Sequence, residues 1–404
     1  MITQNFTADS FACVNRSQYS VVKMRTARRK FANCLHCYIF KISMLLGLLP
    51  FKYNKEKRTF RSSGVALSYS VVINTLLFAW VVKNWPDMSN YELFAKPLLY
   101  IVENVVSYLN CVGIILIFCS TWSGRKRLLR LFNEIVTVRQ LCDSKAFLRD
   151  FDASMMEKRI ILKFCSMFLQ NLLFFSSSFY WSNKMDASYF LVSMLTIILF
   201  NEILLISNQF YHNTLSINHS ILAVNHRLRC LNTRKQLLAA GEINEIFGIY
   251  IRLIRLITHT TTAYEKQLLV IISVRLSVIV QCLFSACMHF GGRGLQMNEL
   301  ELLYFLLIIM LTSLDYWLIM AVCESVWRAQ QQTKVELKHF NTFRTLSVDL
   351  ARDLNTFSIF CSIHKFRFPL CGLFEIHFAT ARNLCTSVVT ALIWLVQYDF
   401  ATSM

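Results

Sequence analysis

Seven apolar stretches, each long enough to cross a bilayer, dominate this chain. A helix needs roughly 20 predominantly apolar residues to span a hydrocarbon core of ~30 Å. We place the spans at 65–83, 97–121, 160–181, 188–212, 268–289, 303–326 and 381–398. Gly64 precedes the first span and Pro97 opens the second, where a helix tolerates proline best. The sequence therefore predicts an all-α membrane protein with seven transmembrane helices.

The composition agrees with a membrane protein. Only 16% of the residues are charged and 55% are hydrophobic, whereas soluble domains carry about 25% charged residues. The net charge of +18 would suggest nucleic acid binding in a soluble protein. The distribution of the basic residues gives a different explanation.

Lysine and arginine are concentrated in alternate loops. Segments 1–64, 122–158, 213–267 and 327–380 carry thirty-four of them, and the loops 84–96, 182–187 and 290–302 carry three. Because cytoplasmic loops accumulate basic residues, we predict a cytoplasmic N-terminus and an extracellular C-terminus. The excess of positive charge is thus explained by the loops that face the cytoplasm, and we expect no nucleic acid partner. We predict a multi-pass protein of the plasma membrane, surrounded by lipid.

The spans divide the chain into four parts. Residues 1–64 form a cytoplasmic N-terminal segment, in which 38–51 reads as an interfacial or tucked-in helix. Residues 65–326 form a six-helix bundle with cytosolic helical extensions, since 213–267 has helix-compatible patterning. A long cytosolic segment, 327–380, precedes the last helix and tail, 381–404.

Four charged residues lie well inside predicted spans, six or more residues from either end: Glu103, Glu202, Arg275 and Asp315. Such residues are costly in lipid and are functional candidates by default. Counting along each helix places the last three near the middle of the bilayer. Arg275 could pair with Asp315, with Glu202 or with both. The cluster is either a buried ion pair that holds spans together or a part of a ligand site or ion path.

Aromatic and amide side chains gather in spans three and four and near their outer ends. Aromatic residues there form either an interfacial belt or the wall of an outward-facing pocket for an uncharged organic molecule. The candidates for such a pocket are Glu103, Asn171, Phe175, Tyr180, Asn201, Glu202, Tyr304 and Asp315.

Motifs of enzymes and metal sites are lacking apart from one isolated CxxC, formed by Cys34 and Cys37, which has no second pair and therefore does not suggest a zinc or redox site. The sequence has no Gly-rich phosphate loop, HExxH or GxSxG. His212, His219 and His226 recur every seven residues, which is ~10.5 Å along a helix and too far apart for one metal ion. We therefore expect no enzymatic activity, no cofactor and no metal.

The last span carries one narrow polar stripe. At 100° per residue, Thr386, Thr390, Ile393 and Gln397 fall within about 60° of one another, and the opposite side is aliphatic. Such a stripe suits a helix that faces a water-filled path. The alternative is hydrogen bonding to neighbouring helices within a bundle.

The segment "GLFEIHFATARNLCTSVVTALIWLVQYDF" (372–400) resembles the signature of insect gustatory receptors. That signature has a Gly-hydrophobic-Phe-x-Ile-Asp turn, followed by Thr-Tyr, five hydrophobic residues and Gln-Phe. Thr390 and Gln397 match with the expected spacing, whereas Ala391 replaces the tyrosine and Tyr398 the phenylalanine. The turn matches at Gly372, Leu373, Phe374 and Ile376, with His377 in place of the aspartate.

The resemblance implies a ligand-gated, non-selective cation channel built as a homo- or hetero-tetramer. The last helix of each subunit would line the pore, and the cytosolic helices before it would anchor the subunits. A small-molecule tastant would bind among spans two to six. The divergence of the signature argues against the sugar and carbon dioxide branches of the family and favours a bitter compound. The implied pore-lining residues are Thr386, Thr390, Ile393, Gln397 and Tyr398.

Three other protein classes share parts of this pattern. A G-protein-coupled receptor would have its N-terminus outside the cell, which the charge distribution contradicts. It would also carry an Asp-Arg-Tyr or Asn-Pro-x-x-Tyr motif, and neither appears at spans three or seven. A transporter would suit the intramembrane charges, but the chain shows no internal repeat. An odorant-receptor-type subunit shares the architecture and differs in the terminal motif.

Overall fold

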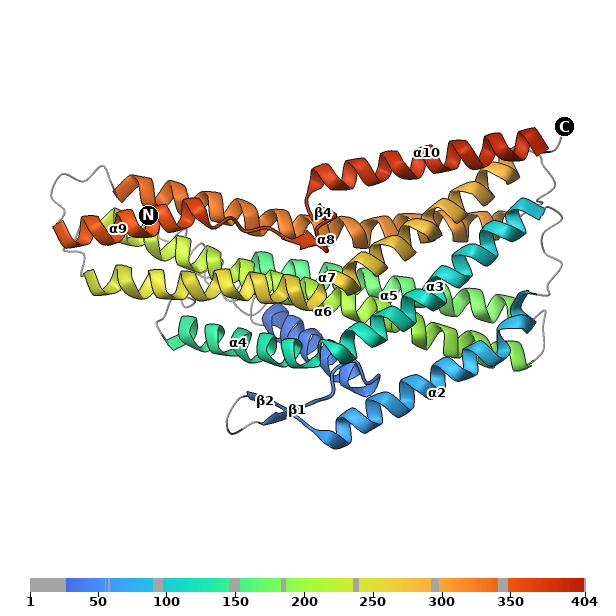
Figure 1. Cartoon of the computed structure of the whole chain (residues 1–404), viewed down its shortest axis with the longest axis horizontal. Helices are drawn as coiled ribbons and strands as arrows, with labels where there is room; N and C mark the ends of the chain where they lie inside the picture. The colour runs from blue at the N-terminus through green and yellow to red at the C-terminus, as the bar shows by residue number, and fades with distance from the viewer. Residues whose placement is uncertain are drawn as a thin grey trace, which may run out of the picture.

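Each of the seven predicted spans lies inside one long helix. The structure, a computed structural model, describes residues 27–54, 56, 59–89, 97–144, 153–182, 187–234, 240–291, 298–340 and 348–402. The helices that cover the spans run along the long axis of the molecule (Figure 1). They are α2 (Gly64–Ser89), α3 (Pro97–Ser123), α5 (Ser154–Ser182), α6 (Ala187–Arg234), α7 (Ala240–Phe290), α8 (Glu299–Phe340) and α10 (Phe378–Thr402).

The remaining elements are short. A helix over residues 27–45 precedes an antiparallel hairpin of β1 (Phe51–Asn54) and β2 (Thr59–Ser62). Helix α4 (Arg125–Ser144) extends α3 beyond its span, and α9 (Val348–Ile363) follows α8. A second antiparallel hairpin, β3 (Pro369–Leu370) and β4 (Phe374–Glu375), leads into α10.

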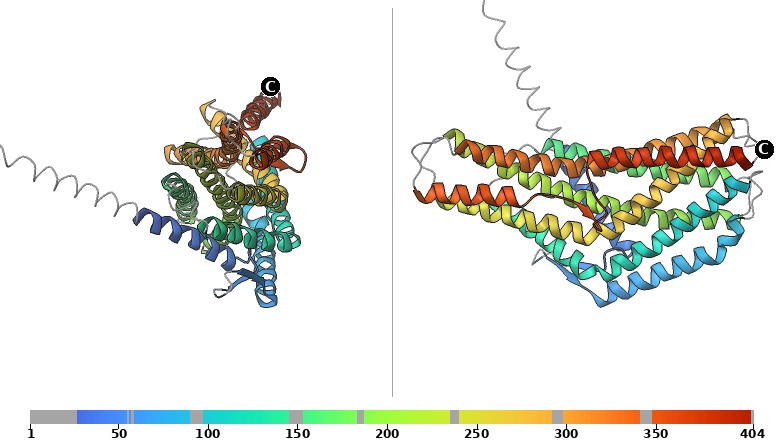
Figure 2. Two further views of the ribbon diagram at one scale, coloured as in Figure 1. Left: turned by 90° about the vertical axis from the view of Figure 1, so that its left-hand side faces the viewer. Right: turned by 45° about the horizontal axis from the view of Figure 1, so that its top comes forward.

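The all-α membrane architecture is confirmed. Over the described residues, six helices are long and apolar enough to cross a membrane, namely α3, α5, α6, α7, α8 and α10, and α2 is apolar over Gly64–Ala79. Three of them continue far past their spans: α6, α7 and α8 lengthen at one end of the bundle, where α9 also lies (Figures 1 and 2). We call this the inner end, because the charge distribution predicts it to be cytosolic, and the opposite end the outer end.

Helix α6 is the central helix of the bundle, and α10 is the least buried of the six helices that are long and apolar enough to cross a membrane. In the most apolar stretch of α6, 61% of the residues are buried, against 11% in α10. Helix α6 packs on α5, α7 and α8, whereas α10 packs on α7 and to a smaller extent on α8. Figure 2 shows α10 at the periphery of the molecule. A large surface of α10 is therefore left for contacts outside this chain.

The inner end is held by polar contacts and aromatic packing. Asn225 of α6 donates from Nδ2 to the carbonyl of Ala329 (2.8 Å) and accepts from Thr333 Oγ1 (2.6 Å). The rings of Tyr250 and Phe357 lie 5.2 Å apart and join α7 to α9. The described residues of the segment predicted to be cytosolic, 327–380, form the end of α8, α9, the β3–β4 hairpin and the first residues of α10.

The helix over residues 27–45 packs against the inner half of the bundle. Its buried face carries Ala32, Leu35, Ile39 and Ser43. The ring of His36 lies 5.4 Å from that of His212 on α6. Burial lowers the pKa of His36 to about 4, with the positive charge of Arg139 acting in the same direction. His36 is therefore neutral at pH 7, and its contact is one of packed rings.

Gly47 lies in the turn between this helix and β1, and its replacement by alanine should be destabilising. Gly47 has φ +73°, and a Cβ there would lie 2.8 Å from the Cα of Ser70. Strain at a positive φ and overpacking each cost about 1–3 kcal/mol. We expect Gly47→Ala to lower the thermal midpoint of the detergent-purified protein by several degrees. Gly64→Ala is the control, because nothing lies within 4 Å of a Cβ there; equal midpoints would contradict the prediction.

Candidate functional site

Three charged side chains meet in the interior of the bundle. Lys163 Nζ of α5 donates to Asp315 Oδ1 of α8, and Arg275 Nη1 of α7 donates to Asp315 Oδ2. Ser207 of α6 accepts from Lys163 Nζ (3.2 Å) and donates to Asp315 Oδ2 (3.3 Å). All four residues are buried. The cluster therefore ties together α5, α6, α7 and α8.

The sequence predicted only part of this charge cluster. Arg275 pairs with Asp315, one of the two partners expected for it. Lys163 was missed because it lies three residues inside the predicted third span, where a cation suggests the membrane interface. Helix α5 begins at Ser154, so Lys163 is about two and a half turns into the helix. Its ammonium group also lies 5.3 Å from the centre of the Tyr211 ring.

Glu202 is the second intramembrane carboxyl group on these helices, and it does not pair with Arg275. Its side chain is 1% exposed. Neither carboxyl oxygen has a hydrogen-bond partner among the residues that the structure describes. A buried polar group without a partner destabilises a fold. Glu202 is therefore a candidate for a functional role and not a structural one.

Replacing Glu202 with leucine should therefore stabilise the protein. Removal of the unpartnered carboxyl group relieves a desolvation cost of about 1–3 kcal/mol, so the thermal midpoint in detergent should rise. Glu336→Leu is the matched control, because Glu336 is also buried but accepts from Arg229 Nη2 at 2.7 Å, and its loss should lower the midpoint. A fall of similar size in both variants would contradict the prediction.

The other pocket candidates lie in different environments. Asn171 and Asn201 donate from Nδ2 to carbonyls of their own helices, at Met167 (3.0 Å) and Ile197 (2.9 Å). Phe175 is exposed, Glu103 and Tyr304 are partly buried, and the side chain of Tyr180 lies outside the described residues. None of those described lines the cavity considered below. The ligand role of each candidate stays a prediction.

The polar stripe of the last span points away from the rest of the chain. Thr386, Thr390, Ile393 and Gln397 are all exposed on α10. The side of α10 that packs on the bundle, here called the attached side, lies roughly opposite the stripe at 100° per residue. It carries the buried Val388 and the partly buried Leu392 and Leu395. The stripe is thus available to water or to another subunit.

The stripe hydroxyls are satisfied by their own helix. Thr386 Oγ1 donates to the carbonyl of Arg382 (3.1 Å), and Thr390 Oγ1 donates to that of Thr386 (3.0 Å). Among the described residues, neither hydroxyl donates to a neighbouring helix of this chain. Tyr398 is exposed as well, about 100° around the helix from Gln397.

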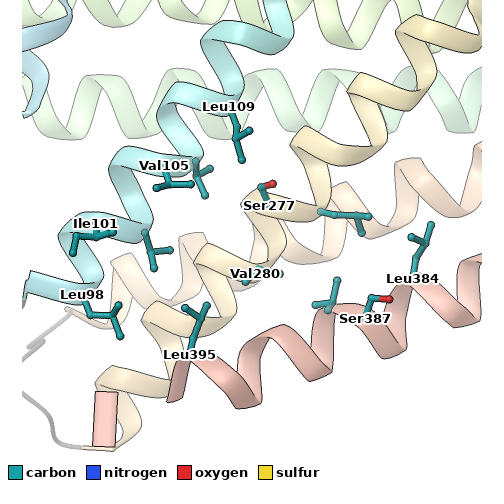
Figure 3. Close-up of a pocket in the computed structure, with 13 residues that line it drawn as sticks. Leu98, Ile101, Val105, Leu109, Ser277, Val280, Leu384, Ser387 and Leu395 are labelled. Atoms are coloured by element: carbon teal, nitrogen blue, oxygen red, sulfur yellow. The ribbon is translucent and has the colours of Figure 1, made fainter. Parts of the chain in front are cut away.

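An apolar cavity of about 470 Å³ lies between α3, α7 and α10. Figure 3 shows side chains of all three helices pointing into it, among them Val105 of α3, Val280 of α7 and Leu384 of α10. Its volume falls in the range of ~300–1,000 Å³ typical of small-molecule sites. These residues cannot be recognised from the sequence, because an apolar side chain that faces a cavity looks the same in sequence as one that faces lipid.

Comparison with known proteins agrees with the architecture. The chain is 23% identical to putative gustatory receptor 22d of Drosophila melanogaster, over 92% of this chain and 97% of that one. It is also 23% identical to gustatory receptor for bitter taste 22e of the same organism, over 89% and 93%. The insect olfactory receptor OR5 from Machilis hrabei has the same fold, with a TM-score of 0.67 at 13% identity, over 93% of this chain and 99% of that one.

The family assignment rests on nearly the whole length of the chain. A family model described as 7tm chemosensory receptor matches residues 36–402, which include every helix that covers a predicted span. Receptors of this kind are multi-pass membrane proteins and not enzymes. The chain belongs to the 7tm chemosensory receptor family and is a member similar to insect gustatory receptors.

Proposed function

We propose that the protein is a gustatory receptor that acts as a ligand-gated, non-selective cation channel. Four subunits, identical or mixed, would surround a central pore lined by α10. The lining residues would be Thr386, Thr390, Ile393 and Gln397, with Tyr398 beside Gln397 at the outer constriction. In this arrangement the inner end, with α9 and the extensions of α6 to α8, joins the subunits in the cytosol.

The observation that carries this proposal is the exposed polar stripe of α10. An amide group is unfavourable in contact with hydrocarbon, and the structure leaves Gln397 exposed on the side away from the bundle. Copies of α10 that face a common axis would place these groups in water instead. Four amides form a ring of dipoles without fixed charge, which suits the passage of hydrated cations with little discrimination.

Ligand binding would act on this pore through the bundle. We place the tastant in the outer half, among α3 to α8, near the candidates Glu202 and Asn201. The ligand must bind the open arrangement of α10 more tightly than the closed one to shift the equilibrium. The similarity to a relative named for bitter taste supports a bitter compound as the ligand.

The experiment that tests the function is current recording from cells without endogenous chemoreceptor channels. The full chain is expressed, and bitter compounds, sugars and volatile odorants are applied in turn. A cation current evoked by a bitter compound would support the proposal. A current evoked only by odorants would favour the olfactory-type alternative, and a response abolished by G-protein inhibition would contradict a channel mechanism.

A further inference from the structure

The cavity between α3, α7 and α10 is a long groove in the outer half of the bundle. On α3 its lining runs from Leu98 to Leu109, and on α10 from Leu384 to Leu395. Each stretch covers about 16 Å of helix, close to half of a hydrocarbon core of ~30 Å. Leu98 and Leu395 are near its outer end, where Leu99 of α3 packs with residues of α7 and α10. The groove therefore matches one leaflet of the bilayer in length.

The chemistry of the groove is that of hydrocarbon. Its polar lining groups are the hydroxyls of Ser277 and Ser387, and the other lining residues are aliphatic. Ser277 Oγ donates to the carbonyl of Ser273 (2.9 Å), and Ser387 Oγ donates to that of Asn383 (3.1 Å). Both donors are thus used within their own helices. A polar tastant would find no free donor and no charge among the described lining residues.

The groove is continuous with the surface that the chain presents to the bilayer. Ile101, Val105 and Leu109, which form its α3 wall, are 54%, 51% and 45% exposed. These residues lie in the span of α3, so the molecules that reach them from the side are membrane lipids. A flexible chain can enter from the bilayer without crossing a polar region.

We propose that the groove binds an acyl chain of an outer-leaflet lipid, wedged between α3 and α7 on one side and α10 on the other. Helix α10 has little other support, since it packs on α7 and in part on α8. The lipid chain would thus complete the contact between the bundle and α10. That this contact bears on gating rests on the proposed function, whereas binding of the lipid does not.

Photolabelling tests the binding directly. The full chain is reconstituted in phosphatidylcholine vesicles that contain a phosphatidylcholine with a diazirine on one acyl chain, irradiated, and mapped by mass spectrometry. We expect labelling of 98–109 and 384–395 above that of the exposed face of α5 around Leu172, which lies outside the groove. Equal labelling of all lipid-exposed helices would overturn the proposal.

Groove-filling variants make the test specific. Val280→Trp and, separately, Ser387→Trp should abolish the excess labelling, and Leu172→Trp should preserve it. Ser387 is exposed, so its variant should fold, which size-exclusion chromatography checks. Cross-links between two receptor copies at 98–109 and 384–395 in place of lipid adducts would show that a second copy fills the groove and would also overturn the proposal. Because no current is measured, failure here is distinct from failure of the channel function.

Discussion

Asp315→Asn should prevent the receptor from folding, whereas Lys163→Met should leave most of it folded. Asp315 is the one carboxylate that pairs with Lys163 and Arg275 in the described cluster. Its loss leaves two buried cations without a counter-charge, and breaking one such buried pair costs about 3–5 kcal/mol. That cost is comparable with a typical total stability of about 5–15 kcal/mol. In Lys163→Met, the pair between Arg275 and Asp315 remains.

The two variants are compared by the yield of monodisperse receptor and by its thermal midpoint in detergent. We expect Asp315→Asn to give little monodisperse protein and Lys163→Met to keep a transition near that of the wild type. Asp349→Asn provides a control, because Asp349 is exposed and pairs with the equally exposed Arg352, where a salt bridge contributes little. Similar losses for Asp315→Asn and Lys163→Met would show that the charge balance of the cluster does not determine stability.

Gln397→Lys should remove the ligand-evoked cation current, and Gln397→Asn should retain most of it. In the proposed tetramer, the first variant replaces a ring of four neutral amides by four positive charges in the path of the cation. Charged rings set which ions can pass a pore. We expect a loss of at least roughly tenfold in current, which corresponds to about 1.4 kcal/mol of barrier.

Whole-cell recording under a saturating ligand measures this effect, with surface biotinylation to correct for the amount of receptor in the membrane. Gln397→Asn preserves the amide and separates the effect of charge from that of substitution itself. If the lysine variant reaches the surface and conducts with wild-type amplitude and selectivity, Gln397 does not line the pore.

The sequence predicted the helices well because lipid imposes a simple rule on them. A span must be apolar for about 20 residues, and the seven stretches found in this way all lie inside long helices. The Arg275–Asp315 pair could also be proposed from the sequence, because the depth of each residue in the membrane can be counted along its helix. That the stripe residues share one face of α10 followed from their angular positions, which do not depend on neighbouring elements.

The remaining features depend on tertiary structure. Lys163 was missed since a start of α5 six residues earlier moves it from the interface into the interior. Glu202 was one of two possible partners of Arg275, and which of them pairs depends on how the helices are rotated against one another. The groove is formed by side chains from α3, α7 and α10 together, and residues such as Val280 carry no sign of it in the sequence.

Cysteine accessibility along α10 tests the central claim, that the exposed stripe lines the pore, most directly. Single cysteines are placed at Thr386, Thr390, Ile393 and Gln397, and at Val388 and Leu392 on the attached side. The wild-type receptor, which keeps its native cysteines, sets the baseline. A cationic methanethiosulfonate reagent applied during ligand-evoked current should block the four stripe variants and leave the two others at the baseline. Block at Val388 and Leu392 with no effect at the stripe would contradict the account.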